Sequence, residues 1–320
     1  MHVEPKTAIR VAVGALVSFI AIRFVAREWQ AISTAAGSLK PDWSGLLIAS
    51  LCVVAGYAVL ILAWRELLTT WRSTLSPIDA VRIWFVSSLG KYIPGKLWSV
   101  GAMAILAKEA GASPVAATGS AVIMQLVNIA AGFTVIALAG AGDLFAAYPF
   151  LRSAAWATLA LSAAGLAVGP QLLNWSVRAA TRLVRQPEIA LPRIGRRTLV
   201  IVYGANVAAW LAYGVGFGLF WSSLLGHGGG ISTAALAVYT ASYLLGFLAI
   251  FAPGGIGVRE AVLAALLISL RLATPADAAL LAAASRVWLT VLEVVPGLLL
   301  LPGISLRRRP SISTPDGPSA

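Results

Sequence analysis

The sequence predicts an all-α integral membrane protein with about six full transmembrane helices and two helix pairs that proline and glycine interrupt. Of its 320 residues, 59% are hydrophobic and only 11% are charged, which is too little charge to cover a soluble domain. The mean hydropathy of +0.86 indicates a fold surrounded mostly by lipid. The formal net charge of +12 is typical of basic cytoplasmic loops in such a protein, so we expect no nucleic-acid partner.

Cysteine and histidine are too scarce for a disulfide framework or a metal site. Cys52 is the single cysteine and lies within an apolar run, while the two histidines, His2 and His227, are far apart in the sequence. We therefore expect no metal ion and no cofactor.

Six apolar runs are long enough to cross a membrane, which takes about 20 mainly apolar residues. The first run carries Arg10 and Arg23 and is not followed by a small-residue cleavage site, so we interpret it as a retained span rather than a signal peptide. The predicted spans are Thr7–Val25, Trp43–Trp64, Pro114–Ala141, Leu151–Val168, Thr198–Leu225 and Pro275–Leu301.

Three helix starts combine an N-cap hydroxyl group with proline at the first helical position. Each lies where the hydropathy pattern predicts that a helix begins. They are Ser76-Pro77, Ser113-Pro114 and Thr274-Pro275.

Two further apolar stretches are interrupted near their middle. The first, Asp79–Lys108, is broken at Gly90–Lys96 and leaves legs of about 11 to 13 residues, too short for 30 Å of hydrocarbon at 1.5 Å per residue. It is predicted to form a re-entrant helix pair. The second, Thr233–Leu270, is broken at Ala252–Glu260, and its first leg of about 20 residues is long enough either to cross or to re-enter.

The distribution of basic residues predicts that both termini lie in the cytoplasm. In this orientation the outward-facing loops carry only Arg27, Lys40, Arg152 and Arg271. The inward-facing loops carry many more, namely Arg65, Arg72, Arg82, Lys108, Arg178, Arg182, Arg185, Arg193, Arg196, Arg197 and the run from Arg307 to Arg309.

Residues 1–306 are predicted to form a single membrane domain with an inverted-topology repeat. Residues 1–142 and 151–303 share the order span, span, broken pair, span. Because each half has three full crossings, the second half begins on the opposite side of the membrane and has the inverted orientation. The segment Gln171–Arg185 has arginines on one face, which predicts an amphipathic helix on the cytoplasmic leaflet or, alternatively, a partner-docking helix. Residues 307–320 are predicted to be a disordered cytoplasmic tail.

The first break contains the residues of a candidate anion site. Two lysines flank the break, and the second opens a helix, so ammonium groups and free backbone N–H groups can cradle a phosphate. Alternatively, both lysines extend to the lipid headgroups. A P-loop is excluded because Leu97 replaces the hydroxyl residue that binds magnesium. The candidate binding residues are Lys91, Tyr92, Pro94, Gly95 and Lys96.

The second break adds glycines that let the backbone approach a ligand, and charged residues follow it. Arg259 and Glu260 are consecutive on a helix and are therefore expected to have different partners. Glu260 and Arg286 are the expected ion pair, with a gating or a purely structural role, and Glu293 lies on the same helix face as Arg286. The remaining candidate binding residues are Pro253, Gly254, Gly255 and Gly257.

Two motifs together resemble the lysylphosphatidylglycerol synthase transmembrane, or flippase-like, family. They are Ser88 to Trp98 (SLGKYIPGKLW) and Ala252 to Ala261 (APGGIGVREA), and the resemblance covers nearly the whole sequence. The resemblance implies the plan of the two-domain synthases of this family. In them, a membrane part moves an aminoacylated phospholipid between leaflets and a soluble domain after it performs lysyl transfer. This sequence ends at Ala320 with no room for such a domain, so we expect no lysyl transfer.

The leading hypothesis is a flippase of the bacterial inner membrane for a phospholipid or a lipid-linked anionic substrate. A membrane-embedded lipid-modifying transferase is the alternative, but the sequence offers no Asp-x-Asp metal pair and no Ser/His/Asp constellation, so no catalytic residue is assigned. A third hypothesis is a non-catalytic subunit that recruits a separate lipid-modifying enzyme through the basic loop Gln171–Arg197.

Overall fold

A computed structural model describes residues 41–92, 97–140, 145–146, 149–184, 194–249 and 253–301, and the regular structure of these residues is entirely helical. The elements are α2 (Trp43–Thr69), α3 (Pro77–Ser88), η1 (Leu89–Tyr92), α4 (Leu97–Glu109), α5 (Pro114–Ala139), α7 (Pro149–Val184), α8 (Arg196–Leu225), α9 (Thr233–Leu248), η2 (Pro253–Gly255), α10 (Val258–Ser269) and α11 (Pro275–Leu300).

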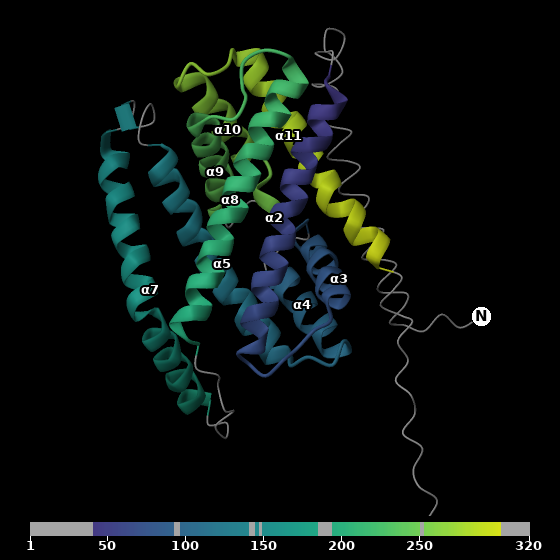
Figure 1. Cartoon of the computed structure of the whole chain (residues 1–320), viewed down its shortest axis with the longest axis vertical. Coiled ribbons are helices and arrows are strands. Elements are labelled where there is room, and N and C mark those ends of the chain that lie inside the picture. Colours follow the sequence, from purple (N-terminus) through teal and green to yellow (C-terminus); the bar gives the residue numbers. More distant parts are fainter. Residues whose placement is uncertain are drawn as a thin grey trace, which may run out of the picture.

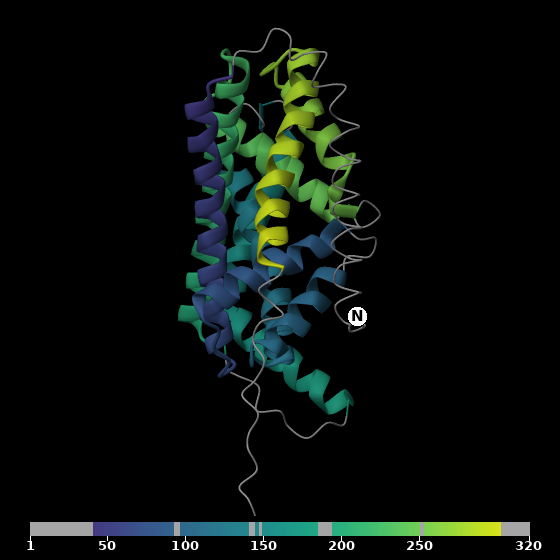
Figure 2. The same cartoon turned by 90° about the vertical axis from the view of Figure 1, so that its right-hand side faces the viewer.

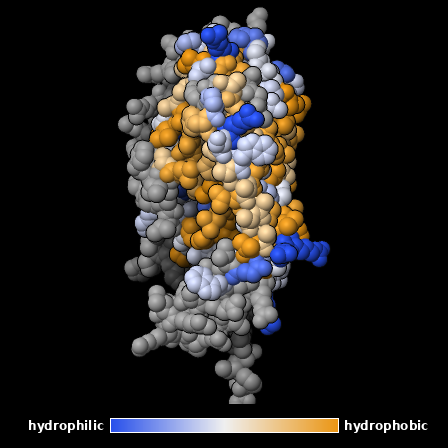
Figure 3. Space-filling model, turned by 90° about the vertical axis from the view of Figure 1, so that its left-hand side faces the viewer, coloured by the Kyte–Doolittle hydropathy of each residue, from blue (hydrophilic) through white to orange (hydrophobic). Residues whose placement is uncertain are grey.

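The predicted all-α membrane architecture is confirmed. Helices α2, α5, α7, α8 and α11 are long and apolar enough to cross a membrane, and they coincide with five of the six predicted spans. The remaining predicted span, Thr7–Val25, lies outside the described residues, as does the predicted tail 307–320. Figure 3 shows a broad hydrophobic band with hydrophilic residues gathered at both of its ends, as a membrane-spanning surface requires.

The three predicted N-caps are present. The hydroxyl oxygens of Ser76, Ser113 and Thr274 accept hydrogen bonds from backbone N–H groups three residues later, at 3.1, 3.3 and 3.2 Å. Helix α2 is capped instead by Asp42, whose carboxylate accepts from the backbone N–H of Ser44 at 3.0 Å. The hydroxyl group of Ser44 also donates to this carboxylate and lowers the pKa of Asp42 below its ordinary value.

Helix α7 differs from the sequence prediction. The span Leu151–Val168 and the amphipathic segment after it form one helix of 36 residues, which continues through Pro170 (Figure 1). Proline removes only one backbone donor from a helix, so a long helix continues with a local distortion where neighbours or water satisfy the freed group. Helix α7 is also peripheral, because only 11% of its most apolar stretch is buried, against 67% for α11.

The two interrupted helix pairs lie at opposite ends of the bundle. Helices α3 and α4 pack together at one end and α9 and α10 at the other, while α11 contacts both α3 and α10 (Figures 1 and 2). Helix α9 has 16 residues instead of the expected 20 or so, because Ser232 caps its start and it ends at Leu248. Sixteen residues span about 24 Å, which is less than the hydrocarbon core of about 30 Å.

This arrangement determines where the breaks lie. The turn η1 forms the start of the first break and η2 lies in the second. These two turns contact each other, and η1 also contacts α11. The centrally placed ends of two short helix pairs therefore meet beside the most buried long helix. The inverted repeat of residues 1–142 and 151–303 stays a prediction.

Candidate functional site: buried charges where the two breaks meet

Helix α11 places two charged residues in the interior of the bundle. Arg286 and Glu293 are seven residues apart, or about two turns, and retain only 5% and 8% of their surface exposed. Charged side chains buried inside a membrane protein require partners, because an isolated charge there is costly. The partners of both residues come from the two breaks and from α2.

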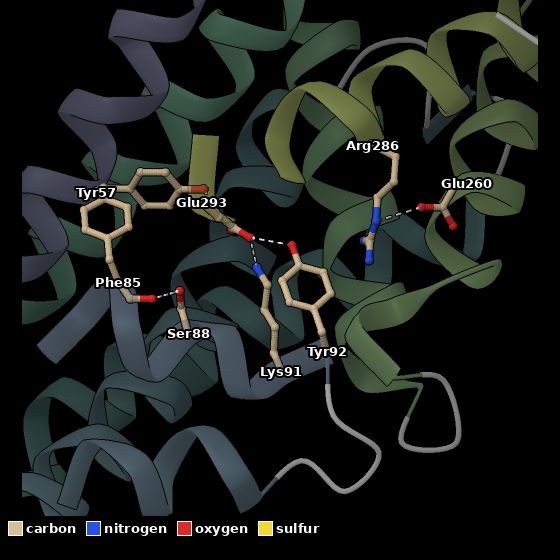
Figure 4. Close-up of polar contacts among 8 residues, drawn as sticks. All are labelled: Tyr57, Phe85, Ser88, Lys91, Tyr92, Glu260, Arg286 and Glu293. Atoms are coloured by element: carbon tan, nitrogen blue, oxygen red, sulfur yellow. Dashed lines mark hydrogen bonds and ion pairs between the residues drawn. The ribbon is translucent and has the colours of Figure 1, made fainter. Parts of the chain in front are cut away.

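Glu293 accepts hydrogen bonds from two other elements. Its Oε1 accepts from the hydroxyl group of Tyr57 in α2 at 2.8 Å, and its Oε2 accepts from the hydroxyl group of Tyr92 in η1 at 3.2 Å. The same Oε2 forms a salt bridge with Lys91 Nζ (Figure 4). This carboxylate thus joins the last span to the first break and to α2.

The pairing of Lys91 with Glu293 bears on the expected phosphate site. A phosphate that binds Lys91 has to take the place of the Glu293 carboxylate, since the ammonium group is engaged by it. Lys91 is the more accessible partner, with 30% of its side chain exposed against 10% for Glu293. Phosphate binding by Lys91 stays a prediction, and three other candidates of this break, Pro94, Gly95 and Lys96, lie outside the described residues.

The glycines of the second break adopt backbone conformations that other residues rarely take. Gly254, Gly255 and Gly257 have φ angles of 57°, 72° and 84°. A Cβ atom at Gly254 would lie 3.1 Å from Nη2 of Arg286 and 3.7 Å from the carbonyl oxygen of Lys91. Glycine here lets the two breaks and α11 approach closely. The turn begins at Pro253, whose ring lies outside the described part.

The expected ion pair between Glu260 and Arg286 is present. Arg286 Nε lies 3.6 Å from Glu260 Oε1, as Figure 4 shows. The other oxygen of Glu260, Oε2, accepts the backbone N–H of Gly257 at 2.6 Å and so caps the start of α10. Glu260 therefore fixes the second break to α11 and stabilises the helix that follows it. A gating role for the pair stays a prediction.

Arg259 has a different environment from Glu260, as its place in the sequence predicts. Its guanidinium carbon lies 4.5 Å from the ring centroid of Tyr243 and 5.3 Å from that of Tyr239, both on α9. These are cation–π distances, and the residue is only 5% exposed. In the described part of the chain, the carboxylates of this site pair with Lys91 and Arg286 instead.

Sequence reasoning missed the tyrosines that complete this site. Tyr57, Tyr239 and Tyr243 lie within apolar helices and outside both motifs. Tyrosines at the middle of a span are a usable signal, because a buried hydroxyl group needs a polar partner. The same signal gives no indication of which carboxylate or cation that partner is.

Within the described ranges, no group of three or more histidine, cysteine, aspartate and glutamate side chains is arranged to hold a metal ion. The site consists instead of cations, carboxylates and tyrosines, which can bind charged groups and exchange ion-pair partners.

Comparison with known families gives one match over most of the chain. The family model described as the lysylphosphatidylglycerol synthase TM region matches residues 7–297, a range that includes every residue of the site. Comparison with curated proteins gives no match.

Proposed function

This chain belongs to the lysylphosphatidylglycerol synthase TM region family, and from that membership, which indicates a lipid-related role in a membrane, we propose that it is a flippase. Its proposed substrate is a phospholipid or a lipid-linked molecule with an anionic headgroup, moved across the bacterial inner membrane. The observation that carries the proposal is the meeting of two interrupted helix pairs at buried charges of α11. Paired discontinuous helices of this kind surround the substrate site in many transporters.

Physical chemistry supports a headgroup passing through this region. Interrupted helices leave backbone groups that lipid cannot satisfy, so the breaks have to face protein, water or a polar ligand. The ion pairs of Lys91 with Glu293 and of Arg286 with Glu260 join the breaks to α11. Exchange of these partners during a transport cycle would open the path, with Glu260, Arg286 and Glu293 as gating residues and Lys91 contacting the headgroup after its release from Glu293.

Reconstitution tests the proposal directly. Vesicles that contain the purified protein and a panel of fluorescent phospholipids should lose lipid from the outer leaflet faster than protein-free vesicles do. Lys91→Gln should slow this movement about tenfold or more, because a hydrogen bond to a charged group contributes about 1.5–3 kcal/mol. The matched control is Lys108→Gln, an exposed lysine at the end of α4, which should behave like the wild-type protein. Equal rates in vesicles with and without protein would refute a flippase; a lipid modified in its headgroup would identify a transferase.

Cysteine labelling tests the proposed orientation, in which residues 171–197 face the cytoplasm. Replacement of Cys52 removes the only native thiol, so single cysteines can be introduced at positions on either side. In spheroplasts, an impermeant reagent should label Lys40→Cys at once and Arg193→Cys only after permeabilisation, as the basic-residue asymmetry requires. The reverse pattern would show that the orientation is wrong.

A further inference from the structure

The described charges at the meeting point of the breaks do not balance. Three cations, Lys91, Arg259 and Arg286, lie there with two carboxylates, Glu260 and Glu293. The two carboxylates form salt bridges with Lys91 and Arg286. One positive charge therefore remains on Arg259, in a region where an uncompensated charge is unfavourable.

The contacts of Arg259 leave part of its hydrogen-bonding capacity unused. Tyr239 and Tyr243 offer the faces of their rings to the guanidinium group, at 5.3 and 4.5 Å, and these faces attract its charge. Nη2 of Arg259 is fully buried and has no hydrogen-bond partner. A buried donor without an acceptor is a feature that a bound anion would resolve.

The backbone around Arg259 holds this cation in a fixed place. Arg259 lies in the first turn of α10, where the positive end of the helix dipole adds to the attraction for an anion. It packs so closely on α9 that a Cβ atom at Gly246 would lie 2.7 Å from Arg259 Cβ. The guanidinium group is thus positioned by tight packing against α9 and by two aromatic rings.

We propose that Arg259 is the residue on which the headgroup docks, and that it binds a phosphodiester carrying a single negative charge. This inference rests on the proposed function and specifies its substrate class. A monoanion neutralises the one excess positive charge of the described cluster, whereas a phosphomonoester dianion leaves a buried negative charge in its place. Arginine suits this ligand because two of its N–H groups can bind two phosphate oxygens at once.

Equilibrium binding by the purified full-length chain in nonionic detergent tests the assignment. The probes are dioctanoyl phosphatidylglycerol, which has a singly charged phosphodiester, and dioctanoyl phosphatidic acid, at a pH where its phosphomonoester carries two charges. Phosphatidylglycerol should bind more tightly than phosphatidic acid to the wild-type protein. Phosphatidic acid binding equally well or better would overturn the charge assignment.

Variants of Arg259 separate its role from general charge effects. Arg259→Gln should weaken phosphatidylglycerol binding about tenfold or more, and Arg259→Lys should weaken it less, because lysine keeps the charge but loses the paired hydrogen bonds. Arg152→Gln, which removes an exposed arginine of α7, is the matched control and should bind like the wild-type protein. If Arg259→Gln does not fold, Arg259→Lys still decides the question by its affinity at an unchanged melting temperature.

The outcome for Arg259 can be told apart from the outcome for the flippase. Wild-type affinity in both Arg259 variants would overturn the docking site even if the protein moves lipid in vesicles. Lost binding in these variants would support the docking site even if the wild-type protein moves no lipid, in which case only the proposed transport would fail.

Discussion

Replacement of Glu293 by alanine is expected to abolish lipid movement and to lower the free energy of unfolding by about 3 kcal/mol. The variant leaves Lys91 without its carboxylate and the hydroxyl groups of Tyr57 and Tyr92 without their acceptor. Breaking a buried ion pair costs about 3–5 kcal/mol, and we expect the lower end because 30% of the Lys91 side chain is exposed to solvent.

Thermal unfolding in detergent and lipid movement in vesicles measure the two effects separately. Glu293→Gln removes the charge but keeps one acceptor oxygen, and its amide N–H group can donate to the hydroxyl oxygen of the second tyrosine, so its loss of stability should be smaller than that of Glu293→Ala. Combining Glu293→Gln with Lys91→Gln should cost less than the sum of the single changes, because the two residues share one interaction. Glu66→Gln, at an exposed carboxylate of α2, serves as the control. Additive effects of the two substitutions would contradict the observed pair.

Gly255→Ala is expected to destabilise the second break strongly. Its φ angle of 72° costs a residue with a side chain about 1–2 kcal/mol. The added Cβ atom would also lie 2.9 Å from the carbonyl oxygen of Gly246 and 3.2 Å from its Cα. Since backbone atoms cannot move aside as a flexible side chain can, we expect a further cost of about 1–3 kcal/mol and a separation of η2 from α9.

Gly226→Ala is a control that isolates the clash from the strain. Gly226, at the end of α8, has a similar φ angle of 70°, but a Cβ atom there meets nothing within 4 Å. The melting temperature of this control variant should therefore fall only by the amount that the strained backbone causes. The melting temperature of Gly255→Ala should fall clearly further. Equal melting temperatures for the two variants would show that the close contact of η2 with α9 contributes little to stability.

Local sequence features determined most of the elements of this protein. The apolar runs located five spans, and the Ser-Pro and Thr-Pro pairs marked helix starts that the structure places at the same residues. The interruptions at Gly90–Lys96 and Ala252–Glu260 were also recognisable, as was the pairing of Glu260 with Arg286. The spans and helix starts depend on hydrocarbon thickness and backbone capping, which act within a single helix. The pairing of Glu260 with Arg286 follows from the need of each buried charge for an opposite one.

Only the tertiary structure decided which distant residues became partners. Glu293 binds Tyr57, 236 positions away, and Lys91, 202 positions away. Among the candidate cations, Arg286 is nearer to it in the sequence than Lys91 is. Likewise, because α9 packs against α10, Arg259 contacts the rings of Tyr239 and Tyr243 instead of a carboxylate. A cation in an apolar sequence requires some compensation, but the choice among carboxylate, ring face and ligand depends on which helices lie against it, and that follows from packing of the whole bundle.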